Sequence, residues 1–167
     1  DYVVSGKNYL SLPAETARRV EVVPAVRTAA GIDMQMVQVD GDENAQTLLF
    51  AVDPHAFRQV WAFDWLEGGD ELLDDLGKDG AILEEQTAAS LGLKVGEGFE
   101  VVTIDGARAT LEVLGVYRDP MMITGITVDT VVFSGLFPRS QLWMVLAVAG
   151  GEQDETTAAI EGAVAHL

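Results

Sequence analysis

Cysteine is absent from this 167-residue sequence, and histidine occurs only as His55 and His166. Without cysteine the chain can form no disulfide bond, no thiol nucleophile and no cysteine-ligated zinc site. The two histidines stand far apart in the sequence, so neither has a second histidine at the short spacing typical of a metal site. The sequence therefore predicts no bound metal.

Basic residues are scarce, since 10 Lys and Arg stand against 27 Asp and Glu and leave a net charge of −17 at pH 7. A surface this acidic repels phosphate backbones, which excludes nucleic acid as an expected partner. Hydrophobic residues still make up 49% of the chain, too many for a disordered segment. A chain of this length can build one sizeable core or two small lobes.

Long apolar runs are also missing. A membrane-spanning helix needs roughly 20 consecutive apolar residues, whereas the longest candidate, residues 142–149, has the length of a strand. The sequence shows no signal peptide. It starts at Asp1 and stops inside a helical pattern, so we expect it to be a piece of a longer protein, with membrane helices flanking it on both sides.

Motifs for catalysis and cofactor binding are incomplete or missing. No serine lies in a G-x-S-x-G elbow, and no D-x-D-x-D-G calcium loop occurs. The S-G-K-N sequence at residues 5–8 and the G-E-G sequence at residues 96–98 both lack glycines that phosphate and dinucleotide loops require. The dense carboxylates of residues 64–79 are interpreted as a solvated acidic face. We therefore expect no catalytic residue, no cofactor and no enzymatic activity.

The first third of the chain predicts the order β-α-β-β. Residues 2–5 form a short apolar strand, and Ser11 caps a helix that runs to about Val23. Residues 26–39 alternate between apolar and polar side chains, which predicts a strand. Residues 47–52 return as its partner after an acidic turn.

The sequence Asp53-Pro54 breaks this pattern. Two short helices are predicted next, one aromatic and one acidic. The aromatic helix carries Phe57, Trp61, Phe63 and Trp65, and the acidic one Leu72, Leu73 and Leu76. Beyond residue 119 the patterns predict a strand at 127–133, a loop at 135–138, a strand at 142–149 and a final helix capped by Asp154.

Residues 80–119 read as a small, closed, β-rich unit. A strand at 81–83 leads into a helix at 84–91, which Gly92 ends because a left-handed cap favours a residue without a Cβ atom. The dipeptide Asp105-Gly106 lies between two apolar runs. It predicts a hairpin in which both turn residues have a positive φ.

Two phrases of this unit resemble the extracytoplasmic core domain of ABC-transporter permeases of the MacB/FtsX-like kind. They are ILEEQTAASLGLKVGE at residues 82–97 and VLGVYRD at residues 113–119. In that family a phrase of the first type precedes a β-rich part, and a phrase of the second type closes it. The order of predicted elements agrees over nearly the whole chain.

Periodicity alone predicts an α+β domain with an insertion. The resemblance implies more, namely a porter-like α/β lobe (β-α-β-β … β-α) interrupted by a smaller β-rich lobe. The first lobe is then made by residues 1–54 with 139–167, and the inserted lobe by residues 55–138. We also expect both termini to lie at the same end of the molecule.

The resemblance further implies a non-catalytic domain on the extracytoplasmic side of the cell membrane, anchored by transmembrane helices of the same permease. A separate cytoplasmic ATPase subunit or domain would hydrolyse ATP. This domain would transmit the resulting motion and contact cargo or a partner protein. Two other hypotheses stay open: a soluble two-lobe ligand-binding or sensor module, and a hydrolase that uses scattered carboxylates.

Candidate contact residues lie in the inserted lobe, because apolar side chains in glycine- and proline-containing loops are hard to bury. Alternate or paired methionines and clustered aromatics are more often core residues, so each could instead be structural. The candidates for contact with cargo or a partner are Trp61, Trp65, Met121, Met122, Ile123, Leu136 and Phe137.

Overall fold

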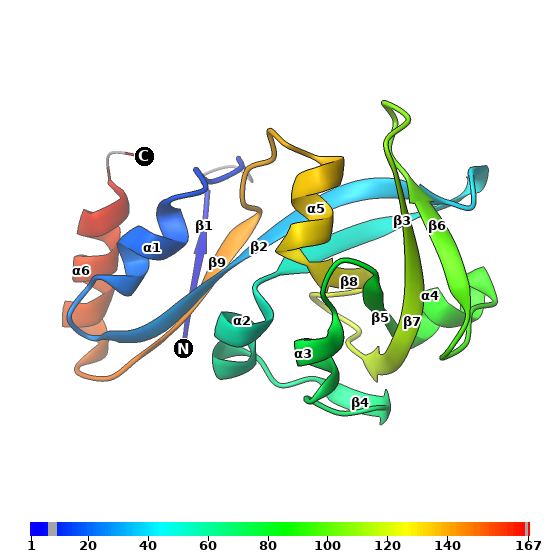
Figure 1. Cartoon of the computed structure of the whole chain (residues 1–167). Coiled ribbons are helices and arrows are strands. Elements are labelled where there is room, and N and C mark those ends of the chain that lie inside the picture. The colour runs from blue at the N-terminus through cyan, green and yellow to red at the C-terminus, as the bar shows by residue number, and fades with distance from the viewer. Residues whose placement is uncertain (7–9, 166) are drawn as a thin grey trace.

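The computed structural model describes residues 1–6, 10–165 and 167 of the chain. In this described part, nine strands form one continuous mixed sheet with six helices packed around it (Figure 1). The expectation of a mixed α and β fold is confirmed, and strands make up the larger part of it. No helix in these residues combines the length and hydropathy of a membrane-spanning segment.

The bounds of the strands and helices are as follows. The strands are β1 Tyr2–Ser5, β2 Val26–Val39, β3 Asp42–Val52, β4 Asp64–Glu67, β5 Gly80–Glu84, β6 Gly98–Val102, β7 Arg108–Arg118, β8 Ile126–Asp129 and β9 Met144–Ala149. The helices are α1 Thr16–Glu21, α2 Pro54–Val60, α3 Leu72–Asp75, α4 Glu85–Leu91, α5 Thr130–Leu136 and α6 Gln153–Val164.

Six of these strands close into a ring. β2 pairs with β3, β3 runs parallel to β8, and β8 pairs with β5. β5 runs parallel to β7, and β7 pairs with β6. β6 returns to β2 through Gln38↔Val102 and Val39↔Val101. Closure pairs the backbone groups on both sides of each strand, so no edge of these strands stays open over the paired length.

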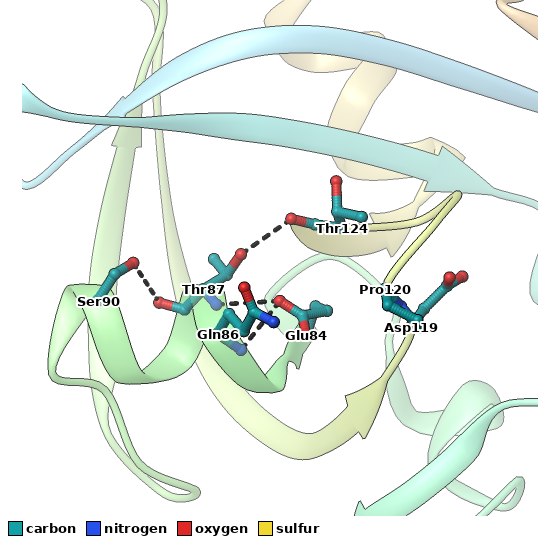
Figure 2. Close-up of a pocket in the computed structure, with 7 residues that line it drawn as sticks. All are labelled: Glu84, Gln86, Thr87, Ser90, Asp119, Pro120 and Thr124. Carbon is teal, nitrogen blue, oxygen red and sulfur yellow. Dashed lines mark hydrogen bonds between the residues drawn. The ribbon is translucent and has the colours of Figure 1, made fainter.

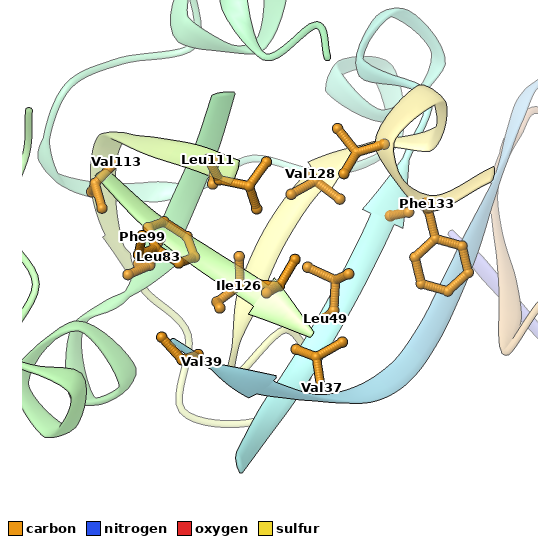
Figure 3. Close-up of a cluster of buried hydrophobic side chains, with 14 of the residues drawn as sticks. Val37, Val39, Leu49, Leu83, Phe99, Leu111, Val113, Ile126, Val128 and Phe133 are labelled. Carbon is orange, nitrogen blue, oxygen red and sulfur yellow. The ribbon is translucent and has the colours of Figure 1, made fainter. Parts of the chain in front are cut away.

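The inside of the ring is filled by every second residue of its strands, as the period of two requires (Figure 3). One end is covered by Val132 and Phe133 of α5. The inward residues are Val37 and Val39, Leu49 and Ala51, Ala81 and Leu83, Phe99 and Val101, Leu111 and Val113, and Ile126 and Val128. The strands are therefore held together by one dry apolar core.

Part of the outer face of the ring carries a second core, in which aromatic side chains pack among aliphatic ones and which is here called the aromatic core. Phe57 of α2 and Phe63 lie on Phe50, Ile82 and Tyr117. Because this layer covers β5 on its outer side, all five residues of β5 are buried. A strand buried on both faces has a continuous apolar run rather than an alternating one, as the sequence of β5 shows.

A third core lies where β1 and β9 extend the sheet beyond the first half of β2. Val20 of α1 and Ile160 of α6 pack on Val145 of β9 there. The hydroxyl group of Tyr2 donates to the carbonyl oxygen of Gln153 at 3.4 Å, so the first strand lies beside the start of the last helix. Figure 1 shows both chain ends in this part of the molecule.

The sheet is not interrupted at residue 54. β2 and β3, which the expected first lobe contains, supply two of the six strands of the closed ring. In the described part of the chain, by contrast, β1 pairs only with β9, and β9 pairs only with β1 and β2. The division into lobes 1–54 with 139–167 and 55–138 stays a prediction.

Two predicted elements are wrong in their type or start. The strand predicted at 127–133 ends at Asp129, whose side chain accepts a hydrogen bond from the backbone N–H of Val131 and starts α5. The β-branched residues that follow favoured a strand, but the N-cap carboxylate favours a helix. Ser11 does not cap α1, because Leu12 pairs with Leu142 and the helix begins only at Thr16.

Other differences concern turns and helix ends. The aromatic helix ends at Val60, so Trp65 lies in strand β4 instead. At Asp105-Gly106 only the glycine has a positive φ, of 85°, because Thr103 closes a longer loop by accepting the N–H of Ala107. Asp154 lies inside α6, whose N-cap is Glu152. The left-handed Gly92 is confirmed, with φ of 68°.

We predict opposite effects for two glycine-to-alanine substitutions. A Cβ atom at Gly125 would lie 2.1 Å from the carbonyl oxygen of Leu48, so Gly125→Ala should lower the free energy of unfolding by more than about 1 kcal/mol. Gly162 lies in α6 with open space around it, so Gly162→Ala should raise that free energy by up to about 1 kcal/mol. Urea denaturation measures both, and a neutral Gly125→Ala would contradict the close approach.

Candidate interaction surface

The loop of residues 119–125, here called the Met loop, joins β7 to β8 and carries two adjacent methionines. Its backbone is held by the buried carboxylate of Asp119. One oxygen, Oδ1, accepts the N–H groups of Met121 and Met122, both at 3.0 Å, and Oδ2 accepts that of Ile123 at 3.0 Å. Three hydrogen bonds to one carboxylate fix the loop in a single conformation.

Tyr117 holds the Met loop through a second hydrogen-bonded contact. Its buried hydroxyl group donates to the carbonyl oxygen of Ile123 at 2.9 Å and lies 3.0 Å from the Oγ1 atom of Thr127. Burial raises the pKa of Tyr117 far above its usual value, so the hydroxyl stays protonated. The strand register places this group. The register of the pairing between β5 and β7 shifts by one residue between Ala81 and Ile82. Because a shift of one residue exchanges the two faces of a strand, Tyr117 lies on the outer face of the ring.

The far end of the loop is attached to α4 and β5. The hydroxyl group of Thr87 donates to the carbonyl oxygen of Thr124 at 2.9 Å, and the N–H of Glu84 donates to that of Gly125 at 2.9 Å (Figure 2). The buried Glu84 side chain caps α4 by accepting the N–H groups of Gln86 and Thr87. The loop is therefore a rigid part of the fold.

The three apolar side chains of the Met loop point in different directions. Met121 is 89% exposed, the largest fraction of any methionine, while Ile123 is fully buried in the aromatic core. Met122 is half-buried and packs at the margin of the same core. Met121 is therefore the one side chain of these three that is available for contact with another molecule.

A polar hollow of about 300 Å³ lies on one side of the Met loop (Figure 2). Glu84 and Asp119 line it, together with hydroxyl groups of Thr87 and Ser90. The Asp119 oxygens and Oε2 of Glu84 already accept backbone N–H groups, so these carboxylates act as structural caps. Figure 2 shows the Asp119 carboxylate directed away from Glu84. The pair therefore lacks the convergence that a hydrolase site would need.

Metal ligands do not gather elsewhere in the described residues, where no group of three His, Cys, Asp or Glu side chains is placed to hold an ion. His55 is exposed in α2, and His166 lies outside the described residues. Burial also raises the pKa of Asp33, which accepts a hydrogen bond from Ser140 at 3.0 Å. Ser140 is the only side chain hydrogen-bonded to Asp33 in the described residues, and no histidine or lysine side chain hydrogen-bonds to this pair there. The expected absence of a metal and of catalysis stays a prediction.

An apolar hollow of about 310 Å³ lies on the other side of the Met loop. Met122 and Trp61 form one wall, and Val3 and Leu146 of the paired strands β1 and β9 form the facing wall. Residues from opposite ends of the sequence therefore meet here. They come from both of the lobes expected from the sequence.

The structure brings some of the predicted contact residues together and separates others. Trp61 and Met122 both line the apolar hollow, and Met121 directly precedes Met122 in the chain. Trp65 is half-buried, since its Nε1 atom donates to Asp70 at 2.7 Å and its ring stands edge-on to Tyr117. The aromatic group is thus mainly core.

The expectation that all candidates are exposed is wrong for Ile123 and Leu136, which are buried. Leu136 lies in the last turn of α5 rather than in a loop and packs into the ring core. Phe137 is the C-cap residue of α5, and its ring centroid lies 4.8 Å from that of Phe133. Phe137 is therefore also partly buried. A charge at Phe137 should therefore destabilise the fold. The contact role of the exposed candidates remains a prediction.

Sequence reasoning missed Asp119, Val3 and Leu146. Asp119 stands before Pro120, a dipeptide that favours turn initiation, so its role as a loop cap had a local signal. Val3 and Leu146 had none, because strand pairing across more than 140 residues brings them together. Tyr117 was likewise hidden, since its orientation depends on a register shift.

Comparison with solved structures identifies the class of fold. The chain is similar to the extracellular domain of the noncanonic ABC-type transporter YknZ from Gram-positive bacteria, with a TM-score of 0.66 and 14% identity over 95% of this chain and 88% of that one. It is also similar to the periplasmic region of MacB from Actinobacillus actinomycetemcomitans, with a TM-score of 0.63 and 9% identity over 96% and 79%.

A third similar structure is a domain of a putative permease protein from Porphyromonas gingivalis, with a TM-score of 0.61 and 14% identity over 92% of this chain and 71% of that one. No family model and no curated protein matches the sequence. The chain thus has the fold of extracytoplasmic domains of ABC-transporter permeases. The resemblance seen in the sequence is confirmed at the level of fold.

Replacing Asp119 should test how far the Met loop depends on it. Asp119→Asn keeps the size of the side chain but exchanges one acceptor oxygen for a donor, which leaves at least one buried N–H unpaired. We expect the free energy of unfolding to fall by about 1–3 kcal/mol in urea denaturation. The exposed Asp105 is the control, because Asp105→Asn should change it by less than about 0.5 kcal/mol. Equal effects would contradict the capping role.

Proposed function

We propose that this chain is the non-catalytic extracytoplasmic domain of an ABC-transporter permease subunit. In this proposal it is anchored by transmembrane helices of the same permease on the outer side of the cell membrane. It transmits motion driven by a cytoplasmic ATPase subunit or domain and contacts cargo or a partner protein.

The observation that carries the proposal is the match of fold over almost the whole chain. At least 92% of the chain superposes on each of three structures, which come from the ABC-type transporter YknZ, from MacB and from a putative permease. A fold by itself does not define function. Here, however, two of the three similar structures are named as extracellular or periplasmic parts of their proteins, and the third is named as a domain of a putative permease.

The described structure supports a mechanical and contact role. The closed ring is held by a continuous apolar core, and its loops are fixed by side-chain hydrogen bonds. A rigid body of this kind moves as a unit when force is applied at one end. Met121, standing in solvent on a fixed loop, supports contact with another protein.

A second candidate function rests on the apolar hollow. A soluble two-lobe ligand-binding or sensor module would hold its ligand where the two parts of the chain meet, and the hollow between Val3 and Trp61 lies there. Pockets that bind small molecules are mostly apolar and have volumes from about 300 Å³ upward. The hollow stands at the lower end of that range, so it favours this function less than the fold favours the first.

Cysteine labelling in cells can test the location, because these 167 residues contain no cysteine and any cysteine elsewhere in the full-length protein can be replaced by serine. Ile104→Cys places a thiol at a position that is 97% exposed. We expect a membrane-impermeant maleimide to label it in the full-length protein of intact cells, with any outer membrane opened. Val128→Cys, at a fully buried position, is the matched control and should react only after denaturation.

Labelling of Ile104→Cys only after cell lysis would place the domain in the cytoplasm. That result would reject the proposed location together with the permease setting.

A charge at the tip of the Met loop tests the contact role. Met121→Lys should change the free energy of unfolding by less than about 0.5 kcal/mol, because the side chain is exposed. In the full-length protein it should abolish complementation of a strain that lacks the gene. Val22→Lys is the control, since Val22 is 73% exposed at the end of α1. Full complementation by Met121→Lys would place the contact elsewhere.

A further inference from the structure

We propose that the outer edge of β1 and the apolar hollow beside it form one docking site for an extended segment of a partner protein. The segment adds a strand to β1, directs an apolar side chain into the hollow, and carries basic residues between its apolar ones. This inference rests on the proposed function, because it specifies which kind of partner the domain contacts.

The outer edge of β1 is open. In the described part of the chain β1 is the last strand of the sheet and pairs only with β9, from Tyr2↔Ala147 to Ser5↔Met144. In an antiparallel sheet, every second residue of such a strand directs its N–H and C=O groups away from its partner. These groups are free to bind the backbone of an extended segment.

The two edges of the sheet differ in how they are protected. The opposite edge strand, β4, has the sequence D-W-L-E, and its register shifts between Trp65 and Glu67. Charges and irregular register are the usual means by which edge strands resist pairing with other chains. β1 has the sequence Y-V-V-S and a regular register, with neither charge nor proline. Both edge strands have four residues, so they differ in charge and register rather than in length, and β1 is the less protected of the two.

The hollow lies on the face of the sheet where an added side chain would point. Val3 and Leu146 are directly paired, so their side chains share that face, and Val3 is 58% exposed. The opposite wall comes from Val60 and Trp61 at the end of α2 and from Met122. Alternate side chains of an added strand would face this space, which gives the site selectivity for apolar residues.

The other face of β1 packs against the third core. Tyr2 and Val4 pack against the core formed with α1 and α6, so the edge is held in place before any partner binds. An edge already in strand conformation binds with a smaller loss of conformational entropy than a flexible one.

Charge decides between the possible occupants. A chain with net charge −17 repels a second copy of itself, so pairing of β1 with β1 of another copy is disfavoured. The same charge attracts a segment that bears lysine or arginine. An extended segment with alternating apolar and basic residues satisfies the edge, the hollow and the charge together.

The test uses the purified chain and three seven-residue peptides: K-V-K-V-K-V-K, the same peptide N-methylated throughout, and E-V-E-V-E-V-E. Affinity is measured by calorimetry, and backbone amide shifts of β1 and β9 by NMR. We expect the first peptide to bind and to perturb β1 and β9. The N-methylated peptide keeps the charge and side chains but has no N–H donors, so it should bind at least about tenfold more weakly. The acidic peptide should not bind.

Two lysine variants separate the site from general attraction of charge. Val3→Lys and Ile104→Lys change the net charge equally, and both positions are exposed, but only Val3 lines the hollow on β1. Lysine on an edge strand also hinders pairing. Val3→Lys should weaken binding at least about tenfold and Ile104→Lys less than about threefold. Thermal unfolding checks that both variants are folded, and the N-methylated peptide tests the site in the unaltered chain.

The inference is overturned if the N-methylated peptide binds as tightly as its parent, or if both variants weaken binding equally. It is also overturned if sedimentation shows that the chain dimerises through β1. These results do not depend on the location of the domain, which cysteine labelling reports separately. If labelling places the domain in the cytoplasm but the peptide binds at β1, only the proposed function is rejected. If labelling places the domain outside the cytoplasm but no peptide binds at β1, only the docking site is rejected.

Discussion

Strand β2 is the element on which the rest of the structure depends. Over its 14 residues it pairs with β9 in its first half, with β3 from Ile32 onward and with β6 at its last two residues. The first contact attaches the part of the fold that holds both chain ends. The last contact closes the ring. Since a strand has two edges, β2 can belong to both parts only by exchanging its partner along its length.

Closure of the ring also determines where the Met loop and the two hollows beside it lie. The ring positions Tyr117 on its outer face, and Tyr117 with Asp119 holds the Met loop. The same loop separates a polar hollow, whose carboxylates are occupied as caps, from an apolar hollow that is open. The structure thus combines a rigid frame with one apolar recess next to a free sheet edge. A domain that contacts another protein while it moves needs both properties.

The similarity in fold at 9–14% identity has a physical explanation. A closed sheet requires an alternating apolar pattern and consistent register, and many combinations of Val, Leu, Ile and Phe satisfy both. The positions with narrower requirements are fewer, such as Gly125, whose backbone approaches that of Leu48, and Gly92 at the left-handed cap of α4. Surface residues such as Val3 and Met121 are free to differ, and they are the ones that would select a partner.

The sequence alone determined the local elements whose signals are local. The alternating pattern of β2, the strand and helix of residues 80–91 and the cap at Gly92 were all predictable, because neighbouring residues decide them. Tertiary structure decided the rest. The run after Asp129 became a helix, and Leu136 became buried, because α5 packs over the end of the ring. The hollow between Val3 and Trp61 exists only because distant strands pair, and no local pattern encodes such a contact.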